Sequence, residues 1–209
     1  MKQYTLYFYH DPMCSWCWGY RPISDQLQAN LPQHLKVEKI LGGLAPDSDK
    51  PMPAELQDKL PATWRRIHSL LGTEFNFAFW DVCKPRRSTY PACRAVIAAD
   101  YQNAGDAMTD AIQRAYYLRA MNPSDRETLE LLAAELGLRT EKFALDLCSD
   151  ETEHELKRQV MFARRSPISG FPSLCLDLDG ELLRVTQDYK DYSVTLKHVD
   201  ELLAAATRS

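Results

Sequence analysis

The chain has 209 residues, of which 45% are hydrophobic and 26% are charged, a balance typical of a globular protein that buries a core. Its formal net charge of −4 argues against a general nucleic-acid-binding protein, which would present a basic surface. No apolar run approaches the ~20 residues that span a bilayer. The apolar stretch after Lys2 is also too short for a signal peptide and leads directly into His10. We therefore expect a cytoplasmic protein without nucleic-acid or membrane partners, in a compartment where structural disulfides are rare.

The first 45 residues predict a strand, a helix and a second strand. Residues 4–9 are apolar on both faces, which is typical of a strand buried within a sheet. A helix over residues 14–31 follows, and we expect Pro22 to kink it. Residues 36–41 alternate apolar and polar side chains and predict the second strand, which Gly42-Gly43 ends. Such a unit joins parallel strands through a right-handed crossover.

Residues 46–165 predict a helical domain, because helical periodicity replaces the strand pattern there. The expected helices cover residues 55–71, 92–103, 107–121, 125–136, 141–147 and 153–165. We expect Ser88 or Thr89 to cap the second of these helices and Ser124 to cap the fourth. Gly137 is expected to end the fourth helix, since glycine readily adopts the left-handed conformation found there.

Strand patterns return near the C-terminus. Residues 173–178 and 181–186 predict two strands, and the Asp179-Gly180 pair between them is a strong hairpin signal. A helix is expected over residues 194–206. Two N-terminal strands, a C-terminal hairpin and a final helix match the thioredoxin arrangement. The sequence therefore predicts an α/β fold, with a discontinuous thioredoxin-like domain (residues 1–45 and 166–209) and a large inserted all-helical domain (residues 46–165).

Cys14 and Cys17 stand three residues apart where the first strand leads into the helix. The unpaired N–H groups and the dipole at a helix N-terminus favour a thiolate. We therefore expect Cys14 to attack a partner disulfide and Cys17, one turn further in and more covered, to resolve the mixed disulfide. A Cys-x-x-Cys pair can also be half of a zinc site, but no second close pair of Cys or His accompanies it.

Gly170, Phe171 and Pro172 directly precede the third predicted strand and are the candidate substrate-binding residues. Proline has no N–H and should mark the start of the strand. A cis bond before Pro172 would let Phe171 present its backbone N–H and C=O to an extended peptide placed across Cys14. Most X–Pro bonds are trans, so an ordinary trans proline at a strand edge is the alternative.

His10 and Trp16 are further candidates beside the cysteine pair. His10 lies four residues before Cys14 and could stabilise its thiolate or accept its proton; the alternative is a strand-end histidine that bonds locally or faces solvent. Trp16 or Trp18 could form an apolar contact for partners, or both could pack against the inserted domain. An aromatic cluster at residues 75–80 is expected to pack in a core.

The other four of the six cysteines have no clear pairing. Cys83 and Cys93 could form a second redox pair, but two free thiols are expected in a reducing compartment. Cys148 and Cys175 are expected to be buried as small apolar side chains.

Three segments together resemble the DsbA-like thioredoxin superfamily, and more narrowly its FrnE-like, unexported branch of predicted disulfide oxidoreductases. The segments are residues 11–19, 88–95 and 168–174. The resemblance implies a thioredoxin fold with an inserted helical domain, Cys14 as nucleophile, Cys17 as its partner and a cis peptide before Pro172. The Ser15-Trp16 pair differs from the Pro-His pair of the strongly oxidising exported members. Since neither residue adds a positive charge near Cys14, we expect a less oxidising protein.

These features predict a thiol–disulfide oxidoreductase that acts on protein or small-molecule thiols and disulfides. Its redox-active disulfide takes the place of a cofactor, no metal is expected, and glutathione is a candidate co-substrate. One alternative is a glutathione-dependent isomerase or transferase, a class in which a single serine-type group replaces the first cysteine; the presence of both Cys14 and Cys17 argues against it. The other alternative is a zinc-binding module without enzymatic activity.

Overall fold

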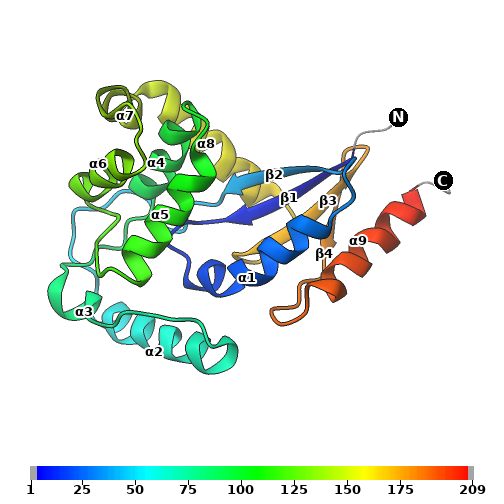
Figure 1. The fold of residues 1–209 in the computed structure, drawn as a ribbon, viewed down its shortest axis with the longest axis horizontal. Coiled ribbons are helices and arrows are strands. Elements are labelled where there is room, and N and C mark those ends of the chain that lie inside the picture. Colours follow the sequence, from blue (N-terminus) through cyan, green and yellow to red (C-terminus); the bar gives the residue numbers. More distant parts are fainter. Residues whose placement is uncertain (1–3, 207–209) are drawn as a thin grey trace.

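The computed structural model describes residues 4–206. Its sheet consists of β1 (Thr5–His10), β2 (Lys36–Leu41), β3 (Ser173–Leu178) and β4 (Glu181–Val185). The strand order is β2-β1-β3-β4 (Figure 1). β1 pairs in parallel with β2 and antiparallel with β3, and β3 forms an antiparallel hairpin with β4. All four predicted strands are confirmed, and the thioredoxin-like fold class with them.

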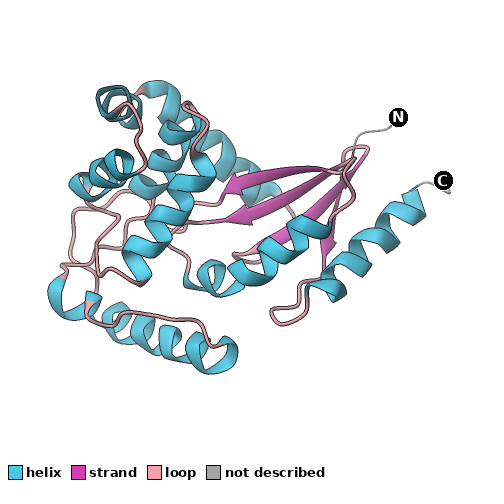
Figure 2. Ribbon diagram, viewed as in Figure 1, coloured by secondary structure: helices cyan, strands magenta, loops and turns pink. Residues whose placement is uncertain are grey.

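Helices cover both faces of the sheet (Figure 2). On one face, Leu27 of α1 (Ser15–Asn30) and Val199 of α9 (Tyr192–Ala206) pack in a cluster with Leu6 of β1. On the other face, Ala163 of α8 (Asp150–Arg165) packs in a cluster with Tyr9. Because β1 is paired along both edges and covered on both faces, its side chains are apolar in both directions.

The chain between β2 and β3 folds into helices that pack beside the sheet (Figure 1). Met108, Ile112, Leu129, Leu132 and Phe143 are among the residues that fill their core. Each predicted helix is present, whereas the single turn α3 escaped sequence analysis because it is shorter than one period of a helical pattern. These helices are α2 (Ala54–Leu71), α3 (Phe79–Val82), α4 (Tyr90–Asp100), α5 (Gly105–Tyr117), α6 (Arg126–Glu135), α7 (Thr140–Leu147) and α8.

A separate aromatic core joins α2, α3 and α5. Trp64 of α2 is 1% exposed, and its ring lies 5.9 Å from that of Phe79 and 5.3 Å from that of Tyr117. Phe75, Phe77 and Trp80 pack in or against the same cluster, as the sequence predicted. This core fixes α2 against α5 on the side of the molecule that carries the cysteine pair.

Of the two predicted helix N-caps, one is correct in position and the other is wrong. Thr89 stands at the N-cap of α4 and Asp125, rather than Ser124, at the N-cap of α6, but neither makes a side-chain cap hydrogen bond. The Ser124 hydroxyl donates instead to the Ser88 carbonyl at 2.7 Å. The side chains of Thr89 and Ser124 are both buried, and buried polar groups form hydrogen bonds with whichever segment packs against them. Gly137 has a φ of 70° directly after α6, as expected for the end of a helix.

The prediction for Cys148 is also wrong, because this side chain is exposed at the end of α7. Its sulfur accepts a hydrogen bond from Arg126 Nη1 at 3.2 Å. Cys175 in β3 is buried, as predicted. Among residues 4–206, the structure contains no helix that is both long and apolar enough to cross a bilayer.

Candidate active site

Cys14 occupies the N-terminus of α1. Its backbone N–H donates to the Asp11 carbonyl at 3.0 Å in a tight turn, and its own carbonyl accepts from Trp18 N at 3.1 Å. Cys14 is the N-cap residue, with an extended backbone conformation at φ −82° and ψ 115°. The first N–H groups of α1, which have no partner within the helix, therefore begin directly beside the Cys14 side chain.

Cys17 lies one helical turn further along and is a protonated thiol. Burial raises its pKa well above the usual range, and the adjoining Cys14 sulfur raises it further through a side-chain hydrogen bond. The Asp11 backbone N–H lowers this pKa. Cys14 is 7% exposed and Cys17 is 4% exposed, so the difference in cover that the sequence predicted is small. The two sulfurs are nevertheless close enough for one to attack a disulfide formed by the other.

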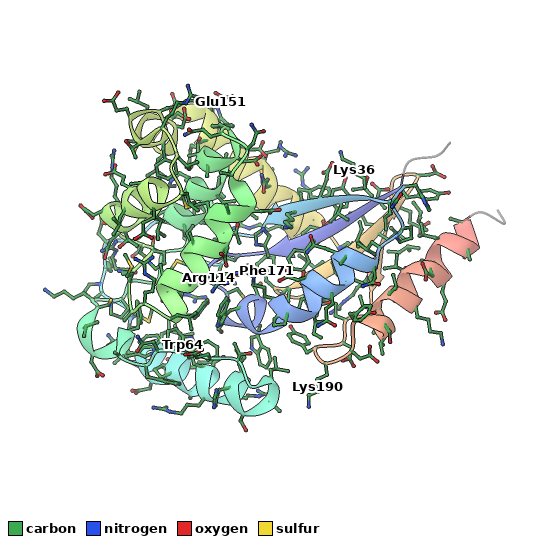
Figure 3. All side chains as sticks on the ribbon, viewed as in Figure 1. Lys36, Trp64, Arg114, Glu151, Phe171 and Lys190 are labelled. Carbon is green, nitrogen blue, oxygen red and sulfur yellow. The ribbon has the colours of Figure 1, made fainter. Side chains whose placement is uncertain are left out.

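The loop before β3 lies across Cys14, although 157 residues separate them in the chain. The Phe171–Pro172 peptide bond is cis, and the Cys14 thiol donates to the Phe171 carbonyl at 3.4 Å. Figure 3 shows Phe171 between the sheet and the helices that connect β2 to β3, which we call the helical block. The Phe171 ring packs directly over Gly42, where an added Cβ would lie 1.9 Å from a ring carbon. Only glycine allows this approach, so the end of β2 holds the loop in place.

A groove of about 350 Å³ runs between this loop and the start of α1. We call it the front groove. It brings together the four substrate-binding residues that the sequence predicted: Trp16, Gly170, Phe171 and Pro172. Ser169, Ser173, Arg184 and Tyr189 complete its lining.

Three residues at the front groove were not singled out by the sequence analysis. Tyr189 meets the Trp16 ring edge-on at a centroid distance of 5.6 Å. Arg66 of α2 stands over the Trp16 ring, with its guanidinium carbon 5.8 Å from the ring centroid. Arg184 of β4 lines the front groove. The Ser15-Trp16 pair contributes no positive charge, as noted from the sequence. The positive charge at the front groove comes instead from Arg66 of α2 and Arg184 of β4.

Trp18 packs against the helical block rather than lining the front groove. Its ring stacks on Tyr117 at 5.7 Å, and its indole N–H donates to the Glu74 carbonyl at 3.0 Å. Of the two tryptophans, Trp16 is thus the one that lines the front groove.

The structure contradicts one alternative for His10, a histidine that faces solvent, and leaves its role towards Cys14 a hypothesis. Its side chain is 4% exposed and therefore does not face solvent, and it stacks on Phe8 at 5.6 Å. Burial lowers its pKa from 6.5 to about 4, with the charge of Lys39 as a smaller cause. A neutral imidazole cannot stabilise the Cys14 thiolate by charge. His10 instead lines a second cavity that contains Cys17.

Asp11 holds the turn before Cys14 and was not singled out from the sequence. It is 0% exposed, and burial raises the pKa of its carboxyl, while hydrogen bonds from its neighbours oppose this. Met13 N donates to Oδ1 at 2.8 Å, and Leu44 N and Thr89 Oγ1 donate to Oδ2 at 2.8 Å and 2.7 Å. Asp11 therefore links the cysteine turn to the segment after β2 and to the start of α4.

Cys93 also points at Asp11 Oδ2, at 3.7 Å, and burial raises the pKa of its thiol. Cys83 donates to the Ala120 carbonyl at 3.1 Å. All six cysteines are free thiols. The two thiols considered as a second redox pair thus have different partners. Within residues 4–206, no three His, Cys, Asp or Glu side chains converge as a metal site would require.

Comparisons with known proteins agree with this geometry. A family model described as thioredoxin matches residues 7–197. The solved structure of a candidate protein disulfide isomerase from Nitrosomonas europaea is similar, with a TM-score of 0.85, 26% identity, and coverage of 98% of this chain and 99% of that one. The cytosolic disulfide reductase DsbM from Pseudomonas aeruginosa has a TM-score of 0.74 and 28% identity, with 98% of each chain covered.

Two curated relatives carry a different description. The ClpXP adapter proteins SpxH from Halalkalibacterium halodurans and Bacillus subtilis are 24% and 25% identical over 97% and 83% of this chain. The matches span 68% and 58% of the lengths of these relatives.

Proposed function

This chain belongs to the DsbA-like thioredoxin superfamily, and we propose that it is a thiol–disulfide oxidoreductase whose redox pair is Cys14 and Cys17. The observation that carries the proposal is the placement of the Cys14 sulfur. It lies at the N-terminus of α1, faces the Phe171 carbonyl at 3.4 Å and has the Cys17 thiol as its neighbour. An attacking sulfur, a resolving sulfur and a backbone docking edge meet there.

The reaction follows from these positions. The Cys14 thiolate attacks one sulfur of a substrate disulfide, a Cys14–substrate disulfide forms, and the other substrate sulfur leaves with the bonding electron pair. Cys17 then loses its proton and attacks the Cys14 sulfur. The Cys14–Cys17 disulfide forms and the second substrate thiolate leaves, so the substrate gains two electrons. The reverse sequence oxidises a dithiol.

The front groove supports peptide-like or small thiol substrates. The Phe171 backbone can pair with an extended segment whose sulfur approaches Cys14, and Trp16 offers an apolar contact beside it. Arg66 and Arg184 add positive charge at the groove, which favours substrates that carry carboxylates, glutathione among them. Because DsbM is described as a cytosolic disulfide reductase, we propose a cytoplasmic reaction for this chain as well.

Equilibration with glutathione redox buffers tests the proposal. The thiols of Cys14 and Cys17 are trapped with an alkylating reagent and counted by mass spectrometry. We expect the two to oxidise together as one two-electron couple. Cys17→Ser should accumulate a glutathione mixed disulfide on Cys14, and Cys14→Ser should lose the couple. Cys148→Ser is the control, because it removes an exposed cysteine outside the site. If Cys14→Ser keeps the two-electron couple, the assignment is wrong.

The SpxH relatives favour a second candidate function, the binding of a protein partner without turnover. Purified ClpX immobilised on a sensor surface tests this candidate. Saturable binding of this chain that survives in a Cys14→Ser, Cys17→Ser double variant would support an adapter role. Lack of binding would remove the candidate.

A further inference from the structure

Cys17 borders a second cavity that is distinct from the front groove. This rear cavity has a volume of about 280 Å³, which is room for several water molecules. It lies between α1, the end of the sheet and α5. Besides Cys17 and His10, it is lined by the polar side chains of Ser24, Gln28, Thr109 and Gln113. None of the residues that line the front groove contributes to it.

His10 lines both the rear cavity, which Cys17 borders, and an outer cavity of about 450 Å³. The two cavities adjoin, because they share five lining residues: His10, Gln28, Lys39, Asp106 and Thr109. The carbonyl of His10 accepts from Gly42 N at 2.7 Å, and its ring stacks on Phe8. The imidazole of His10 is buried, and His10 lines both cavities.

Ion pairs surround the two cavities. Lys39 of β2 and Asp106 of α5 are paired at 2.7 Å, with Asp106 77% exposed. Arg21 of α1 is paired with Asp110 of α5 and, at 3.8 Å, with Asp25. The outer cavity adds Asp100 and Glu155 to these charged groups.

His10 itself is uncharged near neutral pH. Burial holds its pKa at about 4, and Lys39 lowers the pKa while Asp106 raises it. A neutral imidazole has one nitrogen that accepts a hydrogen bond and one that donates. It can therefore take up a proton on one side and release another on the opposite side.

We propose that His10 relays the proton of Cys17 through the rear cavity when Cys17 attacks the mixed disulfide. The inference rests on the proposed function. During this step the substrate fills the front groove, so the proton of the buried thiol needs another way out. The rear cavity borders Cys17 and shares no lining residue with the front groove, and His10 lines both the rear and the outer cavity.

The step balances in atoms and charge. The Cys17 sulfur forms a bond to the Cys14 sulfur, the Cys14–substrate S–S bond breaks, and its electron pair leaves on the substrate sulfur. The Cys17 proton passes through water in the rear cavity to one nitrogen of His10. The proton on the other nitrogen passes to water in the outer cavity, so the ring remains neutral and exchange with water restores its tautomer.

Stopped-flow reaction of reduced protein with the aromatic disulfide DTNB separates the two steps, in a Cys148→Ser background that removes the exposed thiol outside the site. Attack by Cys14 releases one coloured thiolate at a rate proportional to the DTNB concentration. Attack by Cys17 on the mixed disulfide releases a second thiolate at a rate independent of that concentration. A missing first phase would count against the proposed function, whereas the relay concerns the second phase alone.

His10→Phe keeps the ring and its stack on Phe8 but removes both nitrogens. We expect the second phase to slow by about tenfold or more while the first phase stays within about twofold. Thr109→Leu places an apolar side chain in the rear cavity and leaves His10 in the protein. It should also slow the second phase. His34→Phe makes the same substitution at an exposed position and should leave both phases unchanged.

The pH dependence and chemical rescue distinguish a relay from a structural effect. Without the relay, the second phase should depend on hydroxide and rise by about tenfold per pH unit, more steeply than in the wild type. His10→Ala leaves space for free imidazole, which should restore the second phase in a saturable way. A second phase that His10→Phe leaves unchanged would overturn the proposal, and so would an equal slowing of both phases.

Discussion

Replacing His10 by phenylalanine also tests how strongly folding depends on this uncharged imidazole. His10 is 4% exposed, and burial lowers its pKa from 6.5 to about 4. In the unfolded chain the same group titrates near its usual value. Between pH 6.5 and pH 4 the unfolded chain therefore binds a proton that the folded protein does not, and acidification favours unfolding.

The size of the effect follows from the two pKa values. Each pH unit between them is worth about 1.4 kcal/mol. The wild type should therefore lose about 3 kcal/mol of its free energy of unfolding between pH 7 and pH 4 because of His10 alone. His10→Phe has no proton to bind at this position and should be spared this loss. Other groups titrate in both proteins, so their contributions cancel in the comparison.

Urea unfolding followed by tryptophan fluorescence at pH 7 and pH 4 measures this difference. The free energy of unfolding of His10→Phe, relative to the wild type, should rise by about 3 kcal/mol on acidification. His34→Phe, at an exposed position, should keep the wild-type pH dependence. If the wild type and His10→Phe lose the same free energy between the two pH values, the reasoning about the buried imidazole is refuted.

Two further substitutions probe how the site is held together. Asp11→Ala removes the acceptor of two backbone N–H groups and the Thr89 hydroxyl and should lower the free energy of unfolding by about 3 kcal/mol. Asp11→Asn can keep an oxygen at the Oδ2 position and place its NH₂ against Met13 N alone, so urea unfolding should show about half that loss; a larger loss than in Asp11→Ala would contradict this account. Gly42→Ala brings a Cβ to 1.9 Å from the Phe171 ring, and should cost about 1–3 kcal/mol and slow the first DTNB phase. If Gly42→Ala has the wild-type free energy of unfolding and the wild-type rate of the first DTNB phase, the loop position does not depend on Gly42.

The sequence predicted what local patterns determine. The strands and helices followed from periodicity, and the Asp179-Gly180 pair marked the hairpin, where both residues have a positive φ. Cys14 and Cys17 were found because their spacing, after a strand and at the start of a helix, is itself the chemical signal. These features depend only on residues close together in the chain.

What the sequence did not predict depends on residues that are distant in the chain. Arg66 stands over Trp16 only because the aromatic core fixes α2 against α5. The sequence of strand β1 did not reveal that His10 would line the rear cavity, because α5 forms the other wall of that cavity. Thr89 has the sequence signature of a helix cap, but its hydroxyl bonds to Asp11, 78 residues away.

The helical block therefore takes part in the chemistry proposed for the dithiol. From α2 it places Arg66 at the front groove, and from α4 it holds Asp11 through Thr89 and Cys93. From α5 it forms the wall of the rear cavity through which the Cys17 proton would leave. The first step depends on the front groove and the second on the rear cavity. Because α5 borders the rear cavity and not the front groove, a substitution in α5 should change the rate of resolution while leaving the rate of the first attack as it is.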